Sequence, residues 1–218
     1  MDTTPLPELT GLRSEYGAHG LRRADLHSDP IEQFSAWFAA ALAANVRDAN
    51  AMSLATATPD GKPSVRIVLL KGFDERGFVF FTNHNSEKGQ HLEANPFAAL
   101  AFYWLPLERQ IRISGSVERT SREDSAAYFH SRPVGSRLGA WVSKQSEVID
   151  ARQVLDSRLA EMTERFEGGD IPLPPHWGGY RLKPDQIEFW QGRPNRLHDR
   201  FRYSRQADGR WQIDRLAP

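Results

Sequence analysis

The stretch MSLATATPDGKPSVRIVLLKGFDERGFVFFT, residues 52–82, decides the fold. It holds three runs of the composition typical of β-strands, at 52–58, 64–71 and 78–82. Turn-forming residues, Asp60-Gly61 and then 74–77, separate these runs. Strands joined by such short turns pair antiparallel, because a parallel pair needs a long crossover connection. The stretch therefore predicts an antiparallel sheet.

Further strands and helices surround this stretch. Two more β-type runs are expected at 98–104 and 109–118, and residues 177–216 return to strands with a hairpin turn at Asp208-Gly209. Helices are expected at 30–45, 86–95, 121–129 and 146–166. These elements predict an α+β domain built on a barrel-like antiparallel sheet.

The first predicted helix has a clear start and an apolar face. Asp29 precedes Pro30 and is expected to cap the helix, and Ile31, Phe34, Phe38 and Leu42 recur at helical spacing. We divide the chain into an N-terminal arm, residues 1–27, expected to be flexible or loosely docked, and one domain, residues 28–218.

Composition excludes several classes of protein. The 218 residues are 39% hydrophobic and 26% charged, as in soluble globular chains, and 28 Lys and Arg balance 28 Asp and Glu. This balance gives no support for nucleic-acid binding. The N-terminus does not resemble a secretory signal, and the longest apolar run, 98–105, is too short to span a membrane, so we expect a cytoplasmic protein. Without cysteine, redox chemistry would need a bound cofactor.

Familiar catalytic motifs are missing from the sequence. No glycine-rich dinucleotide motif, phosphate-binding lysine loop, serine elbow or zinc-binding His-Glu-x-x-His occurs. His84 and His91 form the closest pair of potential metal ligands, but no carboxylate or cysteine converges on them. We interpret them as solvated and predict no metal site.

Cations interrupt the apolar strands and suggest a binding site. Arg66 and Lys71 bound an apolar run that would fit a sheet interior, so they need anionic partners unless they reach water at the strand ends. Lys88 lies at a helix start, where backbone N–H groups favour phosphate. Similar polar groups recur as Thr82-Asn83, Arg109-Gln110, Tyr128, Arg132, Ser136 and Gln145-Ser146. The recurrence favours a site for more than one anionic group.

The C-terminal part carries the densest chemistry. Trp190 offers a flat face for stacking a ring. Arg196, His198 and Arg200 alternate, so in an extended strand they would point the same way. A histidine between two guanidinium groups tends to be neutral and can pass a proton near physiological pH. An edge strand with ordinary salt bridges is an equally good interpretation of this segment.

Taken together, the motifs resemble those of the pyridoxine (pyridoxamine) 5′-phosphate oxidase family over residues 12–218. The motifs that carry the resemblance are RIVLLK (66–71), FTN (81–83), LERQ (107–110), YFHSRP (128–133), GAW (139–141), KQS (144–146), IEFWQG (187–192) and RLHDR (196–200). Each is weak alone, but their order and joint presence are specific.

This resemblance implies a split β-barrel and a homodimer with two FMN sites at the subunit interface. It implies oxidation of pyridoxine or pyridoxamine 5′-phosphate to pyridoxal 5′-phosphate, with O₂ reduced to H₂O₂. The implied FMN contacts are Arg66, Phe81, Thr82, Lys88, Gln110, Gln145, Ser146, Trp190 and Arg200. The implied substrate contacts are Lys71, Tyr128, Arg132 and Ser136 at the phosphate, with Arg196 and His198 as catalytic residues near the reacting carbon. Residues 13–16 match a segment that can cover the substrate.

Two positions depart from the family pattern. Glu87 stands where similar enzymes often carry an arginine against the FMN phosphate, so weaker FMN binding is expected. Arg137 replaces a common glutamine and adds charge near the substrate phosphate. Two other functions stay open: a relative that oxidises a different small ring, and a flavin or pyridoxal-phosphate carrier without turnover.

Overall fold

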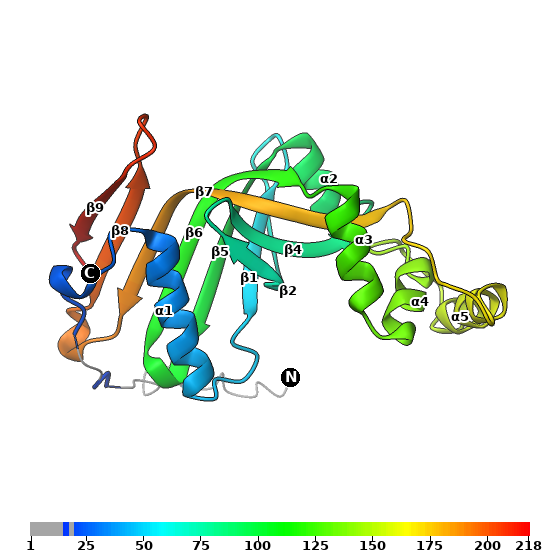
Figure 1. Ribbon diagram of the computed structural model, residues 1–218, viewed down its shortest axis with the longest axis horizontal. Helices are drawn as coiled ribbons and strands as arrows, with labels where there is room; N and C mark the ends of the chain where they lie inside the picture. Colours follow the sequence, from blue (N-terminus) through cyan, green and yellow to red (C-terminus); the bar gives the residue numbers. More distant parts are fainter. Residues whose placement is uncertain (1–14, 18–19) are drawn as a thin grey trace, which may run out of the picture.

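An antiparallel sheet forms the body of the protein (Figure 1). The structure, a computed structural model, describes residues 15–17 and 20–218. Its strands are β1 (Ala51–Ala57), β2 (Pro63–Leu69), β3 (Gly72–Asp74), β4 (Gly77–Asn83), β5 (Phe97–Trp104), β6 (Arg109–Arg119), β7 (Trp177–Gln191), β8 (Asp199–Arg205) and β9 (Trp211–Leu216). They pair in the order β2-β1-β5-β6-β7-β4-β3, with β8 between β7 and β9. Every pair is antiparallel, which confirms the prediction from the short turns.

The long strand β7 joins the two parts of the sheet. Its first residues pair with β4, its last residues pair with β8, and β6 runs along its other edge. The β6–β7 register shifts between Ser114 and Gly115. A Cβ atom at Gly115 would lie 1.9 Å from the backbone oxygen of Lys183, so only glycine allows the strands to approach this closely. This irregularity bends the sheet where its two parts meet.

The first helix covers the main core. Helix α1 (Pro30–Ala43) begins as predicted, because the Asp29 carboxylate accepts a hydrogen bond of 2.6 Å from the backbone N–H of Ile31. Its Phe34 ring packs edge-on against Phe78 at 4.9 Å, deep among the aromatic side chains of the sheet. Leu42 was wrongly placed on the buried face: it is 56% exposed, and Trp37 and Ala41 are buried instead.

Three more helices pack at one end of β7, opposite the β8–β9 end (Figure 1). They are α3 (Arg122–Ser131), α4 (Val134–Val142) and α5 (Gln153–Arg165), and they enclose a second core with Trp177 at the start of β7. Ser121 caps α3, as expected. The helix predicted at 146–166 starts only at Gln153, since Ser146 has a φ of 74°, outside the helical region.

Helix α4 was missed by the sequence analysis. Pro133 follows the helix predicted at 121–129, where a proline is a stop signal, and it also occupies the N-cap position of α4. Proline serves both purposes because it ends one helix and is tolerated at the start of another.

Strand β2 lies at the edge of the sheet, which corrects a second prediction. Its apolar run was expected in the sheet interior, but β2 pairs with β1 alone within the described chain. Val65, Ile67 and Leu69 are consequently 68%, 65% and 43% exposed. Exposed apolar side chains on one edge strand form a surface that a partner could cover.

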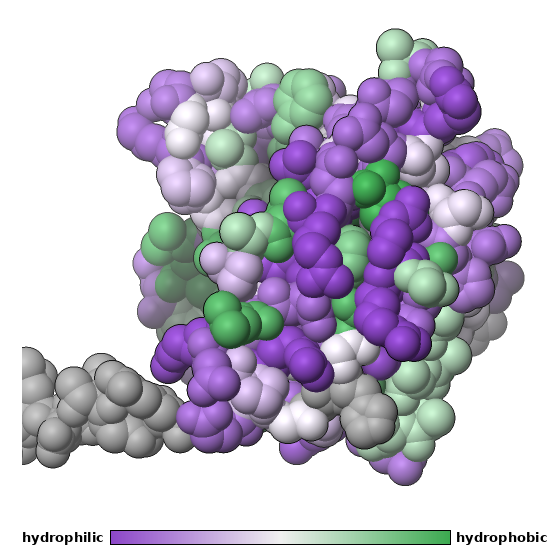
Figure 2. Space-filling view, turned by 90° about the vertical axis from the view of Figure 1, so that its left-hand side faces the viewer, coloured by the Kyte–Doolittle hydropathy of each residue, from purple (hydrophilic) through white to green (hydrophobic). Residues whose placement is uncertain are grey.

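The described part of residues 1–27 contacts the domain. Leu21 is 7% exposed and belongs to the main core, and the Tyr203 hydroxyl donates a 2.7 Å hydrogen bond to the backbone oxygen of His27. Seen from the β8–β9 side, the surface is mostly hydrophilic (Figure 2). Among the described residues, none of the helices combines the length and apolar character needed to cross a bilayer.

His84 is more buried than the sequence analysis predicted. It follows β4, and its ring lies edge-on to Tyr180 at 5.1 Å, with Nε2 buried and without a hydrogen-bond partner. Burial, helped by the nearby Arg119 and Arg122, lowers the pKa of His84 to about 4. The expectation of two solvated histidines is therefore wrong for His84, and also for His91, whose side chain is 14% exposed with Nδ1 at 3.1 Å from Thr56 Oγ1. The described residues contain no cluster of side chains that could hold a metal ion.

We predict that His84 makes the protein less stable in mild acid. The unfolded state binds the proton near pH 6.5 and the folded state only near pH 4, so the free energy of unfolding falls by roughly 1–2 kcal/mol as the pH drops through this window. Replacing His84 by Gln removes this contribution and flattens the pH dependence, measured by urea denaturation between pH 7.5 and 4.5. The matched control is His130→Gln, on the exposed surface of α3. Equal pH slopes for wild type and His84→Gln would refute the assignment.

Candidate active site

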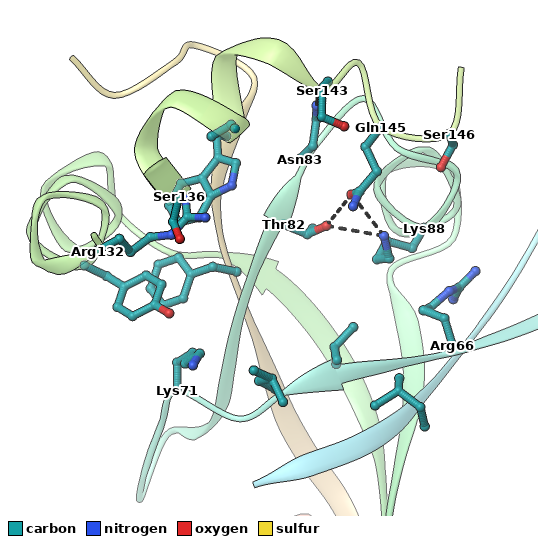
Figure 3. A pocket seen from close by; sticks show the side chains of 18 of the residues that line it. Arg66, Lys71, Thr82, Asn83, Lys88, Arg132, Ser136, Ser143, Gln145 and Ser146 are labelled. Carbon is teal, nitrogen blue, oxygen red and sulfur yellow. Dashed lines mark hydrogen bonds between the residues drawn. The ribbon is translucent and has the colours of Figure 1, made fainter. Parts of the chain in front are cut away.

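A polar cavity of about 700 Å³ opens between the edge strand β2, strand β4 and helices α2 (Glu87–Ala94), α3 and α4 (Figure 3). Ten of the residues predicted from the sequence line it: Arg66, Lys71, Phe81, Thr82, Lys88, Tyr128, Arg132, Ser136, Gln145 and Ser146. The structure thus brings together residues from five separate segments of the chain. Their cations form two groups at opposite ends of the cavity.

Arg66 and Lys88 form the first group. The side chain of Lys88 is buried, and its Nζ donates to Gln145 Oε1 at 3.2 Å and to Thr82 Oγ1 at 3.4 Å. Burial, and then the charge of Arg66, lower the pKa of Lys88. Burial also lowers the pKa of Arg66. Among the described residues, neither cation makes an ion pair within 4 Å, so both positive charges are available to a bound anion.

Local structure explains how these cations are held. Lys88 lies in the first turn of α2, where the capping Ser86 side chain accepts from the backbone N–H of Gly89. Arg66 Nη1 donates to Thr56 Oγ1 at 2.7 Å, and its Nη2 donates to Ser64 Oγ at 2.8 Å. A helix N-terminus beside two cations is a favourable place for a phosphate group.

Arg132 and Lys71 form the second group. The Arg132 guanidinium lies over the Trp177 ring at 4.7 Å, its Nη1 is buried without a hydrogen-bond partner, and burial lowers its pKa. Lys71 Nζ lies 5.8 Å from the centre of the Tyr128 ring. Ser136, on α4, faces the same end of the cavity (Figure 3). This end therefore offers a second anion site, separate from the first.

An aromatic wall and an amide connect the two ends. Phe81 stacks on Tyr128 at 4.1 Å and on Trp177 at 5.5 Å. Gln145 accepts a 3.0 Å hydrogen bond from Thr82 as well as the one from Lys88. A planar ring carrying polar edges could therefore lie between the two cation groups.

The other predicted residues do not line this cavity. They lie on β6 (Gln110), on β7 (Trp190), in the segment leading into β8 (Arg196 and His198) and on β8 itself (Arg200), towards the other end of the sheet. Within this second set, Trp190 and His198 are neighbours, with ring centres 4.6 Å apart. Gln110 pairs with Trp190 across β6 and β7. One chain thus holds the predicted site residues in two separate sets.

The geometry of the second set differs from the prediction. Arg196, His198 and Arg200 do not alternate along one extended strand, because Asn195 and Arg196 have φ values of 56° and 60° and β8 begins only at Asp199. The pKa of His198 is lowered, as expected, but burial contributes more than Arg196 does. His198 Nδ1 accepts a 3.2 Å hydrogen bond from the backbone of Arg193, so its Nε2 carries any proton of the neutral ring.

Arg200 is fixed by contacts that the sequence analysis missed. Its Nε donates to Glu188 Oε1 at 2.8 Å and its Nη1 to the backbone oxygen of Ala217 at 2.8 Å. Glu188 is buried and also accepts from Arg112 at 3.4 Å. The cross-strand position of Glu188 beside Arg200 depends on the β7–β8 register, which the local sequence does not show.

Part of the predicted covering segment can be placed. Arg13 lies outside the described residues, but Tyr16 packs edge-on against Trp190 at 5.6 Å and His198 at 5.5 Å. The backbone N–H of Gly17 donates to Glu108 at 3.1 Å. This segment therefore contacts the second set of residues.

Comparison with known proteins assigns the family. Residues 38–166 match the family model described as pyridoxamine 5′-phosphate oxidase, and residues 177–218 match the pyridoxine 5′-phosphate oxidase C-terminal dimerisation region. The chain belongs to the pyridoxine/pyridoxamine 5′-phosphate oxidase family. The oxidase of this name from Nostoc punctiforme is 58% identical over 95% of this chain and 97% of its own. A second, from Ralstonia nicotianae, is 57% identical over 98% of this chain and all of its own.

Solved structures confirm the split β-barrel fold. PhzG from Burkholderia lata, in complex with tetrahydrophenazine-1-carboxylic acid, is 34% identical, with a TM-score of 0.86 over 92% of this chain and 99% of its own. A pyridoxamine 5′-phosphate oxidase-related, FMN-binding protein from Nostoc punctiforme is 21% identical, with a TM-score of 0.69 over 88% of this chain and all of its own. The named relatives are thus oxidases, and the similar protein PhzG is seen with a ring compound that their names do not mention.

We predict that Arg132 binds anions and contributes little to folding. Because its buried charge has no carboxylate partner, Arg132→Met leaves the melting temperature of the ligand-free protein unchanged or slightly higher. Wild type is stabilised by about 10 mM inorganic phosphate, measured as a thermal shift, and the variant is stabilised less. Arg47→Met, at a 96% exposed side chain, is the control that keeps the full shift. A large loss of stability without phosphate would show that Arg132 is structural instead.

Proposed function

We propose that this protein is an FMN-dependent oxidase that converts pyridoxine or pyridoxamine 5′-phosphate to pyridoxal 5′-phosphate. The observation that carries the proposal is the pair of cation groups at opposite ends of one aromatic-walled cavity, which have no carboxylate within ion-pair distance among residues 15–17 and 20–218. Cofactor and substrate each bear one phosphate, so two separate anion sites match the two molecules. Membership of the oxidase family supports the same reaction.

The first cation group fits the phosphate of FMN. Among the described residues, Lys88 donates hydrogen bonds to neutral oxygens and makes no ion pair within 4 Å, so its buried charge favours a bound anion. Arg66, Ser146 and the start of α2 supply further donors on the same side of the cavity. Thr82 and Gln145 are placed to bind polar groups of the flavin next to this phosphate.

The second cation group fits the phosphate of the substrate. Lys71 and Arg132 would bind it, with Tyr128 and Ser136 as hydrogen-bonding neighbours. An anchor at this end fixes the substrate ring relative to the flavin, so that the reacting carbon C4′ meets flavin N5. Arg137 does not line the cavity, so the extra charge at this position acts on the substrate phosphate only at longer range.

We propose further that the complete site needs a second copy of the chain. The set containing Gln110, Trp190 and Arg200 does not line the cavity of its own chain, and strand β2, which borders that cavity, exposes an apolar face. The match of residues 177–218 to a dimerisation region supports this arrangement. In the homodimer, the second set of one chain would complete the cavity of the other.

The protein residues then have distinct tasks in the reaction. When bound, FMN would supply the redox chemistry, with hydride from C4′ as the reducing equivalent and O₂ as the final acceptor that becomes H₂O₂. Oxidation of the alcohol also releases a proton from its hydroxyl group; with the amine, the imine product takes up water and releases ammonia. Burial, and then the charge of Arg196, lower the pKa of His198, which favours the neutral ring that can accept a proton, and Arg196 can orient the C4′ substituent. Both residues would be supplied by the partner.

Oxidation of another ring compound is the second candidate. The likeness to PhzG, which was crystallised with tetrahydrophenazine-1-carboxylic acid, favours it. That ligand carries a carboxylate and no phosphate, whereas the second cation group here combines Lys71 with Arg132. A flavin or pyridoxal-phosphate carrier without turnover is the third candidate function. It would give no catalytic role to Arg196 and His198.

The central test is reduction of bound flavin by substrate without oxygen. We expect the visible flavin band of the FMN-loaded protein to bleach when pyridoxine 5′-phosphate or pyridoxamine 5′-phosphate is added, and to return when air is admitted. The control substrate is unphosphorylated pyridoxine, which lacks the anchor and should bleach the band far more slowly. A flavin that binds but is bleached by neither phosphate ester would favour the carrier or the other-ring oxidase.

The shared site predicts rescue between two inactive variants. Lys71→Met/Arg132→Met damages the cavity, and Arg196→Ala/His198→Ala damages the second set, so each is expected to lose nearly all turnover as a homodimer. In an equal mixture of co-expressed chains, half the dimers are hybrids with one undamaged site, which restores about a quarter of wild-type activity. Activity that stays at the level of the separate variants would show that both sets serve one chain. Turnover near wild type in Arg196→Ala/His198→Ala alone would reject their catalytic role.

A further inference from the structure

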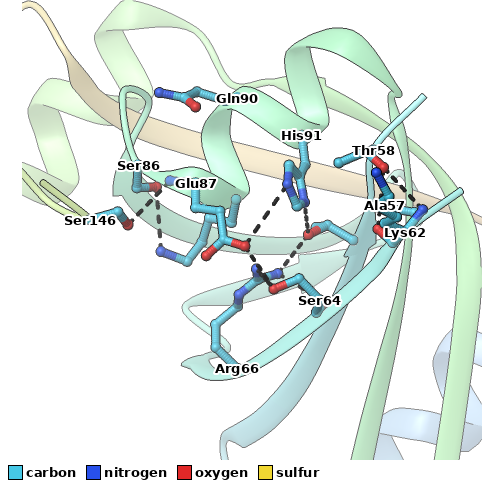
Figure 4. A network of polar contacts seen from close by, with 12 residues as sticks. Ala57, Thr58, Lys62, Ser64, Arg66, Ser86, Glu87, Gln90, His91 and Ser146 are labelled. Carbon is cyan, nitrogen blue, oxygen red and sulfur yellow. Dashed lines mark hydrogen bonds and ion pairs between the residues drawn. The ribbon is translucent and has the colours of Figure 1, made fainter. Parts of the chain in front are cut away.

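A carboxylate borders the cation group that we assign to the FMN phosphate. Glu87 is the one acidic residue among those that line the described cavity; it is the first residue of α2, and its side chain lies next to Arg66 (Figure 4). Its side chain is 56% exposed. An acidic group so close to an anion site is unexpected, because it repels the ligand that the neighbouring cations attract.

Short contacts hold the Glu87 carboxylate in this position. Ser64 Oγ donates a 3.0 Å hydrogen bond to Glu87 Oε1 and accepts one of 2.8 Å from Arg66 Nη2. The serine hydroxyl therefore links the carboxylate to the guanidinium. His91, one turn further along α2, has its Nε2 at 4.0 Å from the same oxygen.

The charge of Glu87 reaches both cations of the group. It raises the pKa of Arg66 and that of Lys88, against the lowering that burial causes. Glu87 therefore partly neutralises the two charges that a phosphate would use. In addition, the backbone N–H of Glu87 donates to Ser146 Oγ at 3.2 Å. Ser146 is one of the predicted FMN contacts, so this hydrogen bond already uses its hydroxyl oxygen as an acceptor.

We propose that Glu87 weakens binding of the cofactor phosphate and so reduces the preference of this protein for FMN over unphosphorylated riboflavin. The proposal rests on the proposed FMN site. Repulsion acts on the phosphate and leaves the flavin ring unaffected, since Glu87 lies at the phosphate end of the cavity. According to this proposal, the negative charge of Glu87 lowers the affinity for FMN, and its hydrogen bond to Ser64 does not.

The test compares two flavins on full-length protein stripped of cofactor, with binding followed by quenching of flavin fluorescence. Glu87→Gln removes the charge and keeps an oxygen that can accept from Ser64. We expect it to bind FMN about 3- to 10-fold more tightly than wild type and riboflavin with unchanged affinity. The gain in FMN affinity should shrink as the salt concentration rises, because Glu87 is half-exposed.

A control on the same helix separates local from general charge effects. Glu93→Gln makes the same change in net charge, but Glu93 pairs with Arg119 at 2.8 Å and does not line the cavity. It should leave both affinities unchanged. Glu87→Ala, which also removes the hydrogen bond to Ser64, should still bind FMN more tightly than wild type does.

Other outcomes overturn the inference or the proposed function separately. Unchanged or weaker FMN binding by Glu87→Gln would show that the carboxylate chiefly positions Ser64 and Arg66, which overturns the inference. Equal tightening for FMN and riboflavin would show that Glu87 acts away from the phosphate, with the same consequence. If wild type and variants all fail to bind any flavin, the proposed FMN function itself is wrong.

Discussion

Desolvated cations without carboxylate partners are the constraint on which the site depends. Lys88 and Arg132 are held among neutral oxygens and aromatic rings, and burial lowers the pKa of both. Such charges cost stability in the free protein, and a bound anion recovers that cost. The fold must therefore be stable enough without them, and the large aromatic core beneath α1 provides this stability. Strand β4 connects the core and the binding site, since its Phe78 and Phe80 lie in the core and its Phe81 and Thr82 line the cavity.

Strand β7 connects the two sets of predicted site residues. Its first residues pair with β4, next to the cavity, and carry Trp177, which lies under Arg132. Its last residues pair with β8 and carry Glu188, which fixes Arg200. One rigid strand thus holds both sets of predicted residues, at opposite ends. Because fifteen residues of extended chain separate these ends, one chain does not bring the two sets together.

Local sequence signals predicted the parts of the fold that depend on neighbouring residues. The turns at Asp60-Gly61 and Asp208-Gly209 join antiparallel hairpins as expected, and Asp29 caps α1. Positions set by distant contacts were not predictable in this way. The apolar pattern of β2 suits a buried strand, yet its place at the sheet edge depends on which strands pair with it. Helix α4 was missed because Pro133 gives the same local signal for a stop and for a start.

The candidate site shows the same limit. The sequence singled out all the cations of the cavity, since each interrupts an apolar run or stands at a helix end. It did not show that Gln110, Trp190 and Arg200 lie elsewhere, because motif order along a chain carries no information on which copy supplies a side chain. The separation of the two sets of site residues follows from the pairing register of β7, and the exposed face of β2 shows where a second chain could contact the cavity. In the homodimer proposed above, a site divided in this way would link cofactor binding to assembly, because each chain would supply only one of the two sets.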